Sequence, residues 1–289
     1  MNRKTFLYFS ALTISLFSFS CTSLFYQPKS SMIYNPSDFG YEYQSIDFRS
    51  LDGTALHGWY FPADKNKKEL GTIIQFHGNE ENMTSHFSSL VWLTREGYNL
   101  FTFDYQGYGQ SKGKHNQENL NNDALAALQW AFEKNRDREQ RVGSAMKFVA
   151  YGQSLGGVVL LHAVPAFKNK RSLDAIVSES AFYSYKVVAK ERLAERRATW
   201  LLQPFAYLFV SNKYCPVERI KEIAPTPLLV IHGNADEEVP FSHGEKIFEM
   251  ASEPKTFWAI PEGLHIDAMS EKKHEGKYRK MFLEYLSNL

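Results

Sequence analysis

The chain has 289 residues, of which 44% are hydrophobic and 22% are charged, as is usual for a soluble globular protein. Its 33 basic and 32 acidic side chains give a formal net charge of +1, so charge gives no support to nucleic-acid binding. The two cysteines, Cys21 and Cys215, are far apart, which excludes a disulfide framework and a zinc-ligand spacing. We therefore expect no metal site.

The N-terminus has the pattern of an export signal. Arg3 and Lys4 precede about sixteen uncharged, mostly apolar residues, fewer than the roughly 20 that a membrane span needs. The run ends at Cys21, as in the lipobox of bacterial lipoproteins, which it resembles loosely because Ser18 and Phe19 depart from the usual residues. We expect residues 1–20 to be a signal peptide, Cys21 to carry lipid, and residues 21–40 to form a tether. The folded domain would then be exported and attached to a membrane of the cell envelope, although an ordinary cleaved signal and an uncleaved anchor remain open.

From residue 41 onward strand and helix patterns alternate. An Asp-Gly turn at 52–53 joins two strand patterns at 44–50 and 56–61, which predicts an antiparallel hairpin. Apolar runs then predict buried strands and longer segments predict helices, which indicates an α/β fold with a mostly parallel sheet and helices on both faces. The predicted strands are 72–76, 99–103, 147–151, 175–178, 227–231 and 256–260, and the predicted helices are 84–96, 118–135, 155–168, 241–251 and 274–288.

Residues 181–224 are too long for a simple connection between two strands. A basic stretch at 186–197 is followed by a very apolar stretch at 200–210, which predicts a helical lid over the strand ends. Trp200 and Phe205 would then line a substrate pocket. The alternative is that these helices only complete the packing of a single domain that spans 41–289.

Gly152-Gln-Ser-Leu-Gly156 has the form G-x-S-x-G and lies between a predicted buried strand and a predicted helix. The turn between them leaves no room for side chains two residues either side of Ser154, so glycine is needed there. A strained turn of this kind raises the serine hydroxyl above the edge of the sheet. Ser154 is therefore the predicted nucleophile.

A serine needs a base, and the base needs a carboxylate. His265 follows the last predicted strand and is the predicted base, with His77 and His232 as competitors at other strand ends. Asp236 follows the preceding strand and is the predicted acid, with Glu179 as the alternative. The order Ser, Asp, His along the chain is typical of the α/β hydrolases.

An oxyanion hole would complete this chemistry. The backbone N–H of Leu155, at the start of a helix, and that of Asn79, after the third strand, are the predicted donors. His77 is interpreted as a buried residue that shapes the loop. This chemistry needs no cofactor, and we expect none.

Five segments together resemble the Bem46-like branch of the α/β hydrolases, over roughly residues 41 to 288. The family commonly has Arg where this chain has Gln106, a position outside the triad. The resemblance implies hydrolysis of esters or thioesters that often carry acyl chains. The segments are Phe76-His-Gly-Asn-Glu-Glu-Asn82, Phe103-Asp-Tyr-Gln-Gly-Tyr-Gly-Gln-Ser111, Gly152-Gln-Ser-Leu-Gly-Gly157, His232-Gly-Asn-Ala-Asp236 and Gly263-Leu-His265.

The predicted activity is cleavage of carboxylic esters or thioesters through an acyl-enzyme on Ser154. A peptidase or amidase on the same fold and a binding module without catalysis remain alternatives. The expected partners are a small-molecule substrate and a membrane, with no nucleic acid, and a monomer is the default state.

Overall fold

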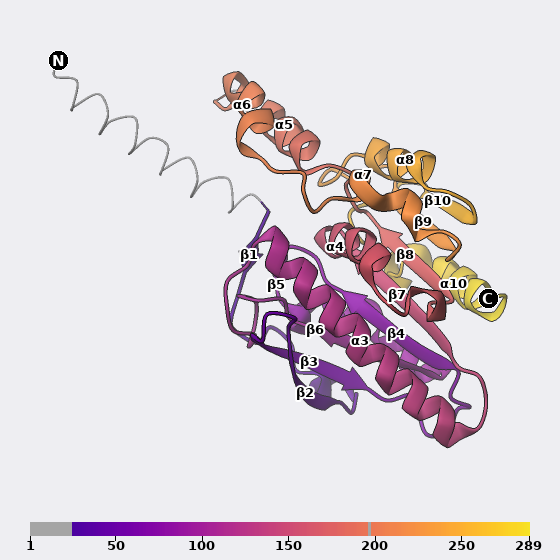
Figure 1. The fold of residues 1–289 in the computed structure, drawn as a ribbon. Helices are drawn as coiled ribbons and strands as arrows, with labels where there is room; N and C mark the ends of the chain where they lie inside the picture. The colour runs from indigo at the N-terminus through magenta and orange to yellow at the C-terminus, as the bar shows by residue number, and fades with distance from the viewer. Residues whose placement is uncertain (1–24, 196–197) are drawn as a thin grey trace, which may run out of the picture.

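The computed structural model describes residues 25–195 and 198–289 (Figure 1). Its centre is an eight-stranded sheet with the strand order β10-β9-β8-β7-β4-β6-β3-β2. The strands from β10 to β6 are parallel to their neighbours, whereas β3 is antiparallel to both β6 and β2. The expected sheet with its antiparallel hairpin is confirmed. The strands are β2 (Gln44–Arg49), β3 (Ala55–Phe61), β4 (Gly71–Phe76), β6 (Tyr98–Phe103), β7 (Lys147–Gln153), β8 (Ala175–Glu179), β9 (Leu228–Gly233) and β10 (Lys255–Ile260).

Both faces of this sheet are covered, which explains why its central strands are apolar throughout. Along β4, Ile74 and Phe76 join the hydrophobic cluster on one face, whereas Ile73 joins the cluster on the other. In β7, Phe148 likewise lies in the first cluster and Val149 in the second. Successive side chains of a strand point to opposite faces, so a strand buried on both sides shows no polar alternation.

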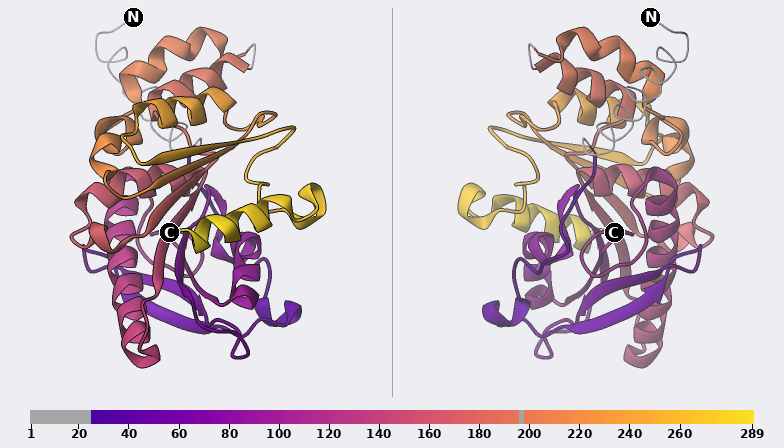
Figure 2. Two further views of the ribbon diagram at one scale, coloured as in Figure 1. Left: turned by 90° about the vertical axis from the view of Figure 1, so that its right-hand side faces the viewer. Right: turned by 90° about the vertical axis from the view of Figure 1, so that its left-hand side faces the viewer.

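Helices form the two outer layers (Figures 1 and 2). Buried residues of α3, α4 and α8 belong to the first cluster, and those of α10 and of the segment 83–96 belong to the second. The helices are α2 (Met83–His86), α3 (Gln117–Val142), α4 (Leu155–Ala163), α5 (Tyr185–Glu195), α6 (Gln203–Phe209), α7 (Pro216–Arg219), α8 (Phe241–Met250), α9 (Glu271–His274) and α10 (Lys277–Ser287).

The predicted helix at 84–96 is instead a short α2 followed by 3₁₀ turns at Phe87–Ser89 and Val91–Glu96. The hydroxyls of Ser88, Ser89 and Thr94 donate to carbonyls three residues earlier, which competes with the α-helical pattern.

The helix predicted at 118–135 is α3, which continues to Val142 and ends at Gly143 with a φ of 71°. Its last two turns are polar, so they lack the apolar periodicity on which the predicted boundary rested. Strong helix formers continue the helix through them.

The described part of the expected tether packs against the domain. Phe25 and Tyr26 are buried, and the Phe25 ring lies 5.1 Å from that of Tyr185. The short strand β1 (Gln27–Pro28) pairs in parallel with β5 (Glu80–Glu81). Residues 25–40 are therefore part of the folded body in this structure, because two aromatic side chains and a strand pairing hold their beginning to it.

Residues 181–224 contain α5, α6 and α7, as the predicted helical insertion requires. Helices α5 and α6 pack on each other and extend beyond the body of the sheet (Figures 1 and 2). No helix within the described ranges is long and apolar enough to cross a membrane. The predicted signal peptide at 1–20 and Cys21 lie outside the described residues.

Candidate active site

The turn from β7 into α4 places Ser154 at the end of the strand. Its backbone has φ 53° and ψ −120°, and α4 begins at the next residue. A Cβ on Gly152 would lie 2.6 Å from the Cα of Gly157, and one on Gly156 would lie 2.1 Å from the carbonyl oxygen of Phe76. Real Cβ atoms do not approach backbone so closely, so both positions require glycine. A non-glycine residue at positive φ persists only where its surroundings fix it, as they do here.

Asp236 and His265 lie together on loops that follow β9 and β10. These loops touch each other, since a Cβ on Gly233 would lie 2.3 Å from the carbonyl oxygen of Gly263. His265 Nδ1 is 2.8 Å from Asp236 Oδ2. A carboxylate at this distance accepts the Nδ1 proton and leaves Nε2 free to act as the base. The pairing predicted from the sequence is therefore present.

The second oxygen of Asp236 accepts hydrogen bonds from the N–H groups of Glu238 and Val239, both at 2.9 Å. Burial by itself would raise the pKa of Asp236, but hydrogen bonds from His232 and His265 outweigh it and hold the pKa well below its usual range. Asp236 is therefore ionised at neutral pH, with its carboxylate facing His265 Nδ1.

The competing residues have structural partners. Glu179 accepts hydrogen bonds from the Tyr151 hydroxyl at 2.9 Å, from Gln153 Nε2 at 2.8 Å and from the Ala268 N–H at 3.0 Å. Burial raises the pKa of this carboxyl group, which those bonds partly offset. Its acceptor sites thus hold β7 and the loop after His265 rather than the histidine itself.

His232 is fully buried, and its Nε2 donates to the carbonyl of Val239 at 2.9 Å. The same nitrogen lies 3.4 Å from Asp236 Oδ2. His232 thus supports the Asp236 loop, and its contacts are structural.

The end of β8 brings Ser154 and His265 to the same edge. The Glu179 carbonyl accepts the Ser154 N–H at 2.8 Å, and the Ser180 hydroxyl accepts the Ile266 N–H at 3.3 Å. Within the described residues the Ser154 hydroxyl makes no hydrogen bond to His265. Catalytic hydrogen bonds are often long before substrate binds and shorten in the complex.

Residues 77–82 form a loop after β4, which we call the oxyanion loop. Gly78 lies beside the nucleophile, since a Cβ there would lie 3.7 Å from Ser154 Cβ and 3.1 Å from His86 Cε1. Among the described residues, the N–H groups of Asn79 and Leu155 donate to no protein acceptor. Both donors predicted for the oxyanion hole are therefore available at this edge of the sheet.

The carbonyl groups of the oxyanion loop are all held. The peptide group is planar and trans, so holding the Gly78 carbonyl also fixes the direction of the Asn79 N–H on the opposite side of the same plane. Each carbonyl from His77 to Glu81 accepts a hydrogen bond, and the donors in chain order are the Tyr105 hydroxyl at 3.2 Å, His77 Nδ1 at 2.7 Å, the Tyr108 hydroxyl at 3.0 Å, His86 Nε2 at 3.0 Å and the Lys29 N–H at 2.9 Å.

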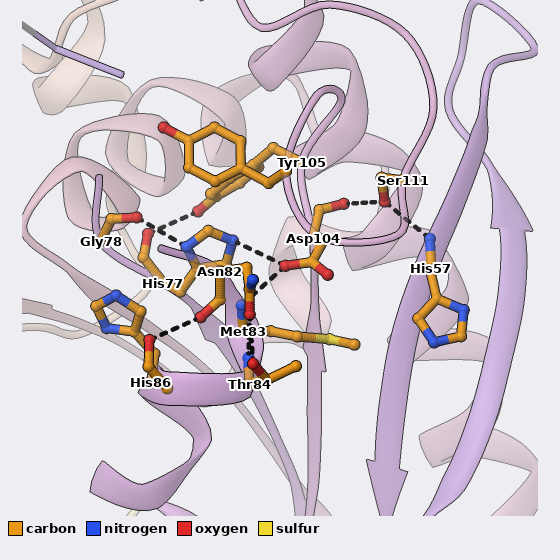
Figure 3. Close-up of polar contacts among 12 residues, drawn as sticks. His57, His77, Gly78, Asn82, Met83, Thr84, His86, Asp104, Tyr105 and Ser111 are labelled. Atoms are coloured by element: carbon orange, nitrogen blue, oxygen red, sulfur yellow. Dashed lines mark hydrogen bonds and ion pairs between the residues drawn. The ribbon is translucent and has the colours of Figure 1, made fainter. Parts of the chain in front are cut away.

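His77 therefore shapes the loop, as the sequence predicted, with its ring between the Gly78 carbonyl and the Asp104 carboxyl group (Figure 3). Its Nε2 lies 3.6 Å from Asp104 Oδ1. Burial lowers the pKa of His77 to about 3 and raises that of Asp104 to about 7. The imidazole consequently stays neutral at physiological pH, with its proton on Nδ1 toward Gly78.

Sequence reasoning did not identify the roles of Tyr105, Tyr108 and His86. Tyr105 and Tyr108 lie in the Asp-Tyr-Gln-Gly-Tyr-Gly segment. This segment resembles the family, but the sequence assigned no role to its tyrosines. Burial lowers the pKa of His86. No recognisable sequence motif contains His86.

The remaining sequence predictions concern metal-ligating side chains and the two aromatic residues of the predicted pocket. The described residues contain no group of three or more His, Cys, Asp or Glu side chains placed to hold a metal ion. Trp200 and Phe205 lie on the α5–α6 hairpin and are 58% and 41% exposed. Their contribution to a substrate pocket stays a prediction.

Comparison with known proteins assigns the family. The family model described as "Serine aminopeptidase, S33" matches residues 67–219, more than half of the chain. The uncharacterized protein YfhR of Escherichia coli (strain K12) is 33% identical over 266 residues, which cover 91% of this chain and 86% of YfhR. Protein bem46 of Schizosaccharomyces pombe is 27% identical over 252 residues, which cover 85% and 78%. The chain belongs to the Bem46-like α/β hydrolases.

Solved structures share this fold. The esterase Pf2001 of Pyrococcus furiosus superposes with a TM-score of 0.69 at 21% identity, over 90% of this chain and 98% of the esterase. The acylaminoacyl peptidase of Pyrococcus horikoshii gives a TM-score of 0.60 at 17% identity, over 88% and 43%. At these identities the superpositions show the fold alone.

The first prediction separates the two candidate acids. Asp236→Asn should lower kcat by about 10⁴-fold, as loss of this carboxylate does in other serine hydrolases, because the His265 tautomer is no longer fixed. Glu179→Gln keeps the shape of the side chain and should cost far less in kcat. Steady-state kinetics on variants with native circular dichroism checks this. A larger loss for Glu179→Gln would assign the acid to β8.

Proposed function

We propose that the protein is a serine hydrolase that cleaves carboxylic ester or thioester bonds of acyl-chain substrates through an acyl-enzyme on Ser154. The observation that carries the proposal is the geometry at one sheet edge. Ser154 stands on a strained strand-to-helix turn, and the Asp236–His265 pair, 2.8 Å apart, approaches the same end of β8.

In this mechanism the Ser154 hydroxyl attacks the substrate carbonyl while His265 Nε2 takes its proton. Asp236 stabilises the resulting imidazolium through Nδ1. The oxyanion of the tetrahedral intermediate accepts hydrogen bonds from the N–H groups of Asn79 and Leu155. The leaving alcohol or thiol takes the proton from His265, and a water molecule then hydrolyses the acyl-enzyme by the same route.

Amide cleavage uses the same acyl-enzyme, and the matching family model carries a peptidase description. The bond preference is therefore a comparison of rates. We expect p-nitrophenyl acyl esters to be cleaved with a higher kcat/KM than aminoacyl p-nitroanilides. The opposite order would make the protein an aminopeptidase on this fold.

The second prediction tests the nucleophile. A fluorophosphonate should label the wild-type protein on Ser154 and leave Ser154→Ala unlabelled, because only an activated serine reacts. Ester hydrolysis should fall by about a million-fold in the variant. Ser184→Ala, a change at another buried serine, serves as the matched control and should keep labelling. Equal labelling of wild type and Ser154→Ala would refute the assignment.

We also propose that the enzyme is exported and held at a membrane by lipid on Cys21. The chain length between Cys21 and the buried Phe25 supports a close attachment, since four residues span at most about 14 Å. The Phe25 ring contacts Tyr185 at the start of α5. The face that carries the α5–α6 hairpin would therefore lie toward the membrane.

The third prediction concerns this attachment. Cys21→Ser should move the protein from the membrane to the soluble fraction, since two or more acyl chains on one cysteine bury many methylenes, each contributing about 0.8 kcal/mol. Ser23→Ala should stay at the membrane. Fractionation followed by mass spectrometry of the mature N-terminus measures both. A Cys21→Ser protein that remains membrane-bound and begins at Met1 would show an uncleaved anchor.

The α5–α6 hairpin has the surface that such an orientation needs. Leu201 and Leu208 are 76% and 73% exposed, and Trp200 is also exposed. Lys190, a basic residue on the preceding helix α5, is also exposed. We propose that these apolar side chains contact acyl chains, either of the bilayer or of the bound substrate, while basic residues face anionic head groups.

The fourth prediction follows from an apolar acyl site. Each buried methylene contributes about 0.8 kcal/mol, so kcat/KM should rise about fourfold per methylene until the site is full. Medium-chain p-nitrophenyl esters should therefore be better substrates than the acetate ester.

Trp200→Ala and Phe205→Ala should flatten this chain-length slope and leave acetate hydrolysis unchanged. Leu51→Ala, which removes an exposed apolar side chain in the β2–β3 turn, is the control. A flat slope in the wild type would make the hairpin ordinary packing.

A further inference from the structure

The segment that follows the predicted N-terminal signal is joined directly to the oxyanion loop by hydrogen bonds. Strand β1 lies outside the eight-stranded sheet, and within residues 25–195 and 198–289 its one strand partner is β5, which is part of that loop (Figure 1). We call residues 27–31 the N-terminal strap. No part of the triad lies on it, and neither the family motifs nor the proposed chemistry assigns it a role.

Backbone hydrogen bonds join the strap to the residues that shape the oxyanion hole. The Gln27 N–H donates to the carbonyl of Asn79 at 3.2 Å, and the Lys29 N–H donates to that of Glu81 at 2.9 Å. The Lys29 ammonium also pairs with the Glu81 carboxylate at 3.0 Å. The strap therefore holds the loop through two carbonyls and one ion pair.

The loop in turn holds the strap. Asn82 Nδ2 donates to the carbonyls of Lys29 and Ser31 at 2.9 and 2.8 Å, and the Gly109 N–H donates to the Lys29 carbonyl at 2.9 Å. Asn82 is fully buried, and its Oδ1 accepts the Thr84 N–H as the cap of α2. One side chain thus joins the strap, the oxyanion loop and the first turn of the following helix.

The backbone of the loop needs this support. Glu81 has a φ of 61°, a conformation that is unfavourable for a residue with a Cβ. Such strain persists only where neighbouring contacts fix it. The carbonyls on either side of this strained residue's Cα are both bonded, that of Glu80 to His86 and that of Glu81 to the strap. Without the strap, the backbone of Glu81 is free to leave its strained conformation, and the preceding peptide groups of the loop rotate with it.

Asn79 is affected first. Its N–H belongs to the peptide whose carbonyl His77 holds, and its own carbonyl is held by the Gln27 N–H and the Tyr108 hydroxyl. Bonds on both sides of the Asn79 Cα fix its φ and ψ together, and hence where its N–H points. Without the Gln27 N–H, the Tyr108 hydroxyl alone holds the Asn79 carbonyl, so the peptide groups around the Asn79 Cα are fixed less tightly and the N–H is aimed less precisely at the oxyanion.

We propose that the N-terminal strap is a positioning element of the oxyanion hole, so that hydrolysis depends on a segment directly after the export signal. This inference rests on the proposed function of Ser154, Asn79 and Leu155. Removing one oxyanion donor outright costs about 10²- to 10³-fold in kcat. Loosening one donor should cost less, about tenfold to a hundredfold, and should leave KM within about twofold because ground-state binding does not use it.

The test uses the full-length protein and two variants that release the strap from opposite sides. Gln27→Pro removes the N–H that bonds to Asn79, at an exposed position on an edge strand. Asn82→Asp keeps an oxygen to cap α2 but loses both amide hydrogen bonds to the strap. Ser30→Pro is the matched control, since it places a proline in the same segment where no N–H is bonded to a described residue.

The expected result is a fall in kcat of about tenfold to a hundredfold for Gln27→Pro and Asn82→Asp, with KM little changed and Ser30→Pro like the wild type. If either variant folds and keeps the wild-type kcat, the strap has no positioning role and the inference is overturned. If one unfolds, the other decides. If the wild type and Ser30→Pro neither hydrolyse esters nor react with fluorophosphonate, the proposed function fails instead.

Discussion

The active site depends on how little space surrounds the turn between β7 and α4. Ser154 has a positive φ because the strand must reverse into a helix within one residue, and glycines at 152 and 156 allow it. The same close approach presses α4 against the carboxyl end of β4, where the Phe76 carbonyl would meet any Cβ at 156. Ser154, the Leu155 N–H and the oxyanion loop are therefore placed by one steric constraint.

The sequence was sufficient to place these groups because each follows a strand of the predicted parallel sheet. Ser154, Asp236 and His265 come after β7, β9 and β10, and parallel strands end at one edge of a sheet. It was not sufficient for the loop 77–82, whose carbonyls are held by Tyr105 and Tyr108 from another segment. These contacts join side chains and backbone that are distant in the sequence and meet only in the folded chain. Hydrophobic periodicity therefore does not predict them.

The N-terminal segment shows the same limit. Serine, proline and tyrosine between 21 and 40 suggested a tether, and a two-residue strand has no detectable alternation. In the structure Phe25 and Tyr26 are buried and the strap follows at once. The proposed export signal, lipid attachment and oxyanion hole would thus be consecutive along the chain, with Gln27 only six residues after Cys21. An enzyme arranged in this way would have its oxyanion loop beside its point of attachment to the membrane.

The central claim is that Ser154, His265 and the oxyanion loop act on one carbonyl group. A crystal structure of the wild-type protein after reaction with a fluorophosphonate tests it most directly. We predict phosphorus on Ser154 Oγ, with one phosphonyl oxygen within hydrogen-bond distance of the N–H groups of both Asn79 and Leu155 and His265 Nε2 facing Oγ. Phosphorus on another residue, or a phosphonyl oxygen that turns away from Asn79, would contradict the account.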